Sequence, residues 1–153
     1  MISFKQAQDV LNYAKDFHHK LSEYYRKLND KTDQIRVKMM LDYLTVHEER
    51  LEENIRKIEA NISGKVKETW FKYTLCEDLR DEFLKMIDIM EEITVEDIIR
   101  TAIQLDDCLI RVYKKIATNS DVAEIKEIFS NLSELEDHEK RRFVMDSTRM
   151  YDM

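Results

Sequence analysis

The sequence predicts an all-α protein built as a four-helix bundle. Of its 153 residues one is glycine and none is proline, the two residues least compatible with helix interiors, and 37% are charged. Apolar residues recur every three or four positions through four long segments, as on the buried face of an amphipathic helix. A chain of this length is expected to form a single domain, residues 1–153, with one core.

The first two apolar segments, residues 7–28 and 37–62, predict a helical hairpin. They are separated by the polar residues 29–33, which suit a turn and the start of a new helix. The second segment stops at Gly64, and glycine is the residue that most often follows a helix C-terminus. Because a short turn makes two long helices antiparallel neighbours, we expect the first hairpin over about residues 3–63.

The third and fourth segments predict a second hairpin over about residues 94–147. The stretch Thr94-Val-Glu-Asp97 is typical of a capping box at a helix start, and it precedes the apolar positions of residues 98–116. The polar residues 119–121 then separate this helix from the fourth.

Residues 64–93, between the two hairpins, are too many for a tight turn and predict a long crossover. An amphipathic run at about 77–92 predicts a short helix within it. The crossover also contains Trp70, Phe71 and Tyr73, which are our candidates for an exposed apolar patch. Such a patch would favour a homodimer.

Charge and hydropathy limit the partners and the compartment. The net charge of −7 argues against nucleic acid and anionic membranes, because binding to phosphate needs clustered Lys and Arg. No apolar run approaches the 18 residues of a membrane span, and the first residues lack the apolar segment of a signal peptide. We therefore expect a cytoplasmic protein in which Cys76 and Cys108 are reduced thiols.

One string of residues occurs twice, 91 positions apart. The two copies are Leu41-x-x-Leu44-x-x-His47-Glu48-x-Arg50 and Leu132-x-x-Leu135-x-x-His138-Glu139-x-Arg141. Leucines three apart share one face of a helix, and the His-Glu pair lies where that face continues. The repeat predicts a duplicated helix pair with polar groups facing the bundle interior.

Polar groups interrupt the apolar stripes at similar heights in the four helices. Counted from each predicted turn at a rise of about 1.5 Å per residue, these groups fall within a few residues of the same height. The candidate metal ligands in this layer are His18, His47, Glu48, Asp106, His138 and Glu139.

Two explanations of this polar layer stay open, because burying such groups unpaired costs on the order of several kcal/mol each. The groups can bind a divalent metal such as iron, manganese or zinc, or they can form a hydrogen-bonded network without metal. Neighbouring helix positions point about 100° apart, so one member of each His-Glu pair can also face solvent.

The tandem hairpins, the long crossover and the His-carboxylate layer resemble the ferritin-like superfamily, and most nearly its rubrerythrin-type members, over about residues 3–147. In that superfamily each half supplies a Glu from one helix and a Glu-x-x-His motif from the next, and together they bind two irons. The resemblance implies that His18 and Asp106 take the positions of the two single carboxylates.

In one register of this resemblance, His47 and His138 match the histidines of the two motifs. Leu44 and Leu135 then stand where the motif glutamates should be. The motif is incomplete in both halves.

In the other register, Glu48 and Glu139 match the motif glutamates. Leu51 and Arg142 then stand where the histidines should be. Neither register gives a complete diiron site.

Two functions follow as expectations, and the sequence does not decide whether the chain is an enzyme. The incomplete motifs favour a ferritin-like bundle that serves as an interaction or regulatory module, dimeric and without metal. The alternative, which the resemblance implies, is a rubrerythrin-like non-haem metal-binding protein that acts in oxygen or peroxide reduction or in metal handling.

Overall fold

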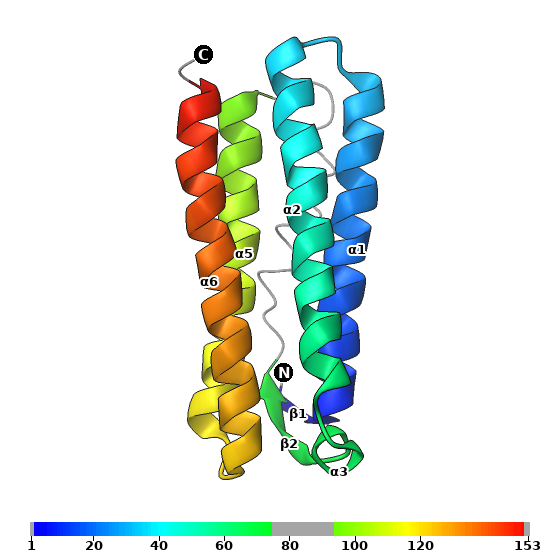
Figure 1. Cartoon of the computed structure of the whole chain (residues 1–153), viewed down its shortest axis with the longest axis vertical. Coiled ribbons are helices and arrows are strands. Elements are labelled where there is room, and N and C mark those ends of the chain that lie inside the picture. Colours follow the sequence, from blue (N-terminus) through cyan, green and yellow to red (C-terminus); the bar gives the residue numbers. More distant parts are fainter. Residues whose placement is uncertain (1, 75–93, 152–153) are drawn as a thin grey trace.

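Four long helices form the body of the molecule. The computed structural model describes residues 2–74 and 94–151. Within them, α1 (Ala7–Lys31) and α2 (Ile35–Ala60) form one antiparallel hairpin, and α5 (Val95–Asn119) and α6 (Ala123–Tyr151) form the other (Figure 1). The predicted all-α bundle of two hairpins is confirmed, whereas the helix predicted at about 77–92 lies outside the described residues.

The four helices do not simply alternate in direction along the chain. In Figure 1, α1 and α6 begin at the bottom of the bundle, whereas α2 and α5 begin at the top. The chain therefore leaves α2 at one end of the bundle and enters α5 at the other. As a result α2 and α5 run in the same direction, although each is antiparallel to its own hairpin partner.

A small sheet lies at the end of the bundle where α1 begins. Strand β1 (Ile2–Gln6) pairs antiparallel with β2 (Trp70–Thr74), with Ile2 opposite Thr74 and Gln6 opposite Trp70. The predicted apolar patch of the crossover thus lies in a strand. The apolar periodicity does not predict these strands, because each is short and its partner lies more than sixty residues away.

The helix boundaries confirm one capping prediction and correct another. Thr94 and Asp97 form the predicted capping box at the start of α5, each side chain accepting from the backbone N–H of the other. Gly64 does not end α2, which stops at Ala60. It is instead the first residue of the short helix α3 (Gly64–Lys67), capped by the Ser63 hydroxyl.

The core is apolar along most of its length. Its fully buried side chains include Leu11, Leu21, Met40, Leu41, Leu44, Leu51, Ile55, Phe129 and Phe143. Cys108 is buried as well, but the expected reduced thiol is wrong there, since Cys108 is disulfide-bonded. Cys76 lies outside the described residues. No helix in the part that the structure describes is long and apolar enough to cross a membrane.

The two hairpins repeat at an offset of 88 residues, and not at the 91 of the sequence string. Three pairs of buried residues show the 88-residue offset: His18 and Asp106, Tyr25 and Tyr113, and Glu48 and Glu136. The string fails as a structural repeat, because Leu44 is fully buried whereas Leu135 is 36% exposed. The two offsets differ by three residues, which is almost one helical turn.

Candidate metal centre

A layer of five ionisable side chains crosses the middle of the bundle. It contains His18 from α1, His47 and Glu48 from α2, Asp106 from α5 and Glu136 from α6, and each is at most 3% exposed. These residues continue the apolar stripes of their helices, which is why they point inward. His18, for example, follows Ala14 by four positions and precedes Leu21 by three, and both are fully buried.

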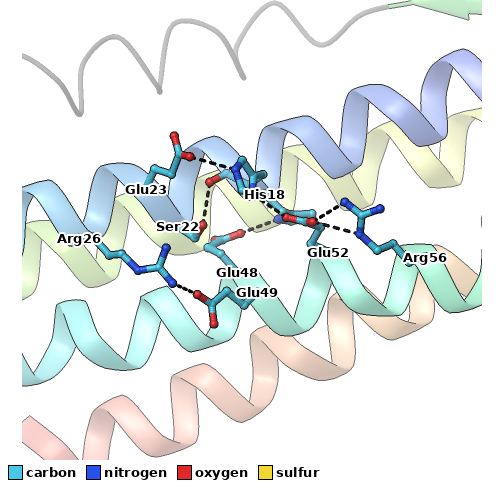
Figure 2. Close-up of polar contacts among 9 residues, drawn as sticks. His18, Ser22, Glu23, Arg26, Glu48, Glu49, Glu52 and Arg56 are labelled. Atoms are coloured by element: carbon cyan, nitrogen blue, oxygen red, sulfur yellow. Dashed lines mark hydrogen bonds and ion pairs between the residues drawn. The ribbon is translucent and has the colours of Figure 1, made fainter.

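The His18 imidazole lies between two carboxylates. Its Nδ1 is 2.5 Å from Oε2 of Glu48 (Figure 2). Its Nε2 is 3.3 Å from Oε1 of Glu136, within ion-pair distance but without the alignment of a hydrogen bond. Burial acts to lower the pKa of His18, but the negative charges of Glu136 and Glu48 outweigh it and raise that pKa well above its usual value.

His47 and Asp106 form a second buried pair, with Nε2 of His47 3.1 Å from Oδ2 of Asp106. The ring of His47 packs against Tyr43 and Phe143, at centroid distances of 6.5 and 5.5 Å, and those two rings also contact each other at 5.8 Å. Burial raises the pKa of Asp106 to about 7 although the neighbouring imidazole acts to lower it. For His47, burial lowers the pKa, but the hydrogen bond and the charge of Asp106 give a net rise.

His47, Glu48 and Asp106 converge on one point. Each offers one donor atom, and these three atoms lie within 4.8 Å of one another. Ligand atoms about 2.0–2.2 Å from a shared zinc or iron ion would be separated by about 3–4 Å, so a small inward movement would be enough to bind one. Nδ1 of His47 has no hydrogen-bond partner among the described residues. One imidazole and two carboxylates, buried together, are a donor set that fits a bound metal.

Ion pairs also lie on the surface of the α1–α2 hairpin. Arg26 of α1 pairs with Glu49 of α2, and Glu52 pairs with Arg56 one turn further along α2 (Figure 2). These pairs use the exposed faces of the two helices, so the buried carboxylate of Glu48 is not neutralised by an arginine of this group.

Four of the six predicted candidate ligands meet in the layer: His18, His47, Glu48 and Asp106. The inward placement expected of His138 is wrong, because its side chain is exposed to solvent. Glu139 is buried but accepts a hydrogen bond from Arg50 at 3.1 Å instead of joining the layer. Whether the four residues bind metal stays a prediction.

Glu136, which was not among the predicted ligands, takes the place expected of Glu139. It lies 88 residues after Glu48, the offset that also relates His18 to Asp106. That signal was in the sequence, but the longer string at 91 residues concealed it.

Comparison with known proteins identifies the fold. No family model matches the chain, and no curated protein does. A solved structure from Thermotoga maritima, described as a candidate ferritin-like diiron-carboxylate protein, matches with a TM-score of 0.59 at 15% sequence identity. The match covers 94% of this chain and 95% of that one. The chain therefore has the ferritin-like fold that its tandem hairpins and long crossover predicted.

Proposed function

We propose that this protein binds a divalent transition-metal ion inside the bundle, with His47, Glu48 and Asp106 as its ligands. The convergence of their three donor atoms within 4.8 Å, at residues no more than 1% exposed, is the observation that carries the proposal. Charged groups are seldom buried together unless they are paired or bind a cation.

The chemistry of the donors narrows the choice of ion. One imidazole nitrogen and two carboxylate oxygens suit iron, manganese and zinc. The fold is shared with a protein described as a diiron-carboxylate protein, so iron is the first ion to test. Bound iron would supply redox chemistry, and oxygen or peroxide reduction is then the activity to assay, in line with the resemblance to rubrerythrin.

His18 and Glu136 support the site from the other side. The contact of His18 Nδ1 with Glu48 holds that carboxylate in one orientation, and Glu136 faces the second nitrogen of the same ring. Three carboxylates and two histidines are present in this layer. Because the layer holds one carboxylate fewer than a full diiron site, we propose one bound ion per chain.

Metal titration tests the proposal. Protein purified without an affinity tag, and stripped with a chelator, is titrated anaerobically with Fe²⁺ in a calorimeter, and the bound iron is then measured by elemental analysis. We expect one ion per chain. The affinity for Fe²⁺ should fall at least tenfold in His47→Ala, because that substitution removes one of the three protein ligands.

The matched control is His138→Ala, which removes the exposed histidine at the same place in the repeated string. It should bind iron as the unchanged protein does. The proposal would be wrong if the unchanged protein bound no iron, or if His47→Ala bound iron as tightly as the unchanged protein does.

A further inference from the structure

Tyr25 has a buried hydroxyl that takes part in none of the contacts of the His-carboxylate layer. The side chain is fully buried, and its hydroxyl has no hydrogen-bond partner among the described residues. A buried hydroxyl without a partner is unfavourable, so such an atom indicates a group that the side chain is placed to bind.

The helix directions bring this hydroxyl toward the metal ligands. Tyr25 lies seven residues, about two turns, after His18 on α1, and helical side chains tilt toward the N-terminus of their helix. Tyr25 therefore leans back toward the layer. Figure 1 shows that α2 and α5 run opposite to α1. By the same rule of tilt, the side chains of Glu48 and Asp106 are expected to lean toward the level of Tyr25.

The electrostatics agree with this placement. Burial is the main cause that raises the pKa of Tyr25, and the next causes are the charges of Glu48 and Asp106. These are two of the three proposed metal ligands. The phenol thus lies near enough to these two carboxylates for their charges to act on it.

We propose that Tyr25 is a fourth protein ligand of the metal, and that its phenolate oxygen binds iron in the ferric state. This inference rests on the proposed function. Hard anionic oxygen donors favour trivalent iron, and the phenolic proton is released to solvent as the iron–oxygen bond forms. His47, Glu48, Asp106 and Tyr25 would then present one nitrogen and three oxygen donors.

A phenolate bound to ferric iron has a signature that the other three ligands lack. Electron transfer from phenolate to iron on excitation gives a visible absorption band, and Raman scattering excited in that band shows ring modes of tyrosinate. Imidazole and carboxylate ligands give neither signal. The spectrum therefore reports Tyr25 separately from the amount of iron bound.

The experiment loads the chelator-stripped full chain with Fe²⁺, oxidises it in air, and measures iron content and the visible spectrum together. We expect one iron per chain and a visible band with tyrosinate Raman modes. Tyr25→Phe should keep most of the iron but lose the band. Its folding is not at risk, since the substitution removes only a hydroxyl that has no partner among the described residues.

Two controls identify the tyrosine. Tyr24→Phe changes the neighbouring half-buried ring, and Tyr113→Phe changes the tyrosine 88 residues later; both should keep the band. Bound iron without a band, or a band that survives Tyr25→Phe, overturns the role of Tyr25 and leaves the metal site standing. Failure to bind iron at all overturns both.

Discussion

Glu48 and Glu136 contact opposite nitrogens of one imidazole, at 2.5 and 3.3 Å from the ring of His18. The two glutamates come from α2 and α6, and His18 comes from α1, so three helices meet through this side chain. Each carboxylate is at most 3% exposed. The imidazole therefore separates two buried negative groups that would otherwise face each other without a cation.

Removing that imidazole should destabilise the metal-free protein strongly. His18→Leu leaves two buried carboxylates without their shared partner, and we expect a loss of about 3–5 kcal/mol in the free energy of unfolding by urea at pH 7. The control is His19→Leu, because the His19 side chain is 56% exposed and its pairs with Glu23 and Glu52 are surface pairs. That change should cost no more than about 1 kcal/mol. Equal losses in the two variants would contradict the account of the layer.

The 88-residue register predicts opposite outcomes for two leucines that the repeated string makes equivalent. Leu44→Glu places a charge in a fully buried position, and we expect a loss of about 3 kcal/mol or more. Leu135→Glu changes a side chain that is 36% exposed and should alter stability by no more than about 0.5 kcal/mol. Thermal and urea unfolding measure both. If Leu135→Glu lowered the free energy of unfolding as much as Leu44→Glu does, the 88-residue register would be wrong and the 91-residue register would be supported.

The buried layer should make the metal-free protein less stable as the pH rises. The pKa of Asp106 is raised to about 7, and those of His18 and His47 are raised above their usual values, so the folded state binds more protons than the unfolded state. For Asp106 the loss of stability runs from about pH 4 to pH 7, and for the histidines it begins near pH 6.5 and continues upward.

Urea unfolding at pH 5 and pH 8, in the presence of a chelator, measures this dependence. Asp106→Asn removes one titrating group and should reduce the fall in stability between the two pH values. Added metal should act in the opposite direction, since ligands bind it in their deprotonated forms and the stabilisation by metal grows with pH. Metal-free stability that rises from pH 5 to pH 8 by the same amount in both proteins would refute the prediction.

Much of the fold could be predicted because short stretches of sequence determine where each helix lies and where α5 begins. The spacing of apolar residues located the four long helices, and the capping box at Thr94 and Asp97 located the start of α5. The pairing of β1 with β2 could not be predicted in this way, since neither strand has a local signal for its distant partner. The preference of glycine for the position after a helix predicts that α2 ends at Gly64, but α2 ends at Ala60 and Gly64 begins α3.

The site was predictable as a layer but not residue by residue. His18, His47, Glu48 and Asp106 interrupt apolar stripes, and that interruption is visible in the sequence. In α6 the stripe could be drawn through either Glu136 or Glu139, since the two residues lie three positions apart on one side of the helix. The packing of α6 in the bundle decides between them. Glu139 lies beside Arg50 of α2, and Glu136 faces His18 of α1.

The central claim is that one metal ion lies between His47, Glu48 and Asp106, and anomalous X-ray scattering tests it most directly. Crystals of the chelator-stripped protein are soaked in Zn²⁺, and data are collected on both sides of the zinc absorption edge. The account predicts an anomalous peak inside the bundle, about 2.0–2.2 Å from a donor atom of each of the three residues. Peaks confined to surface carboxylates and to the exposed His138, with none in the layer, would contradict it.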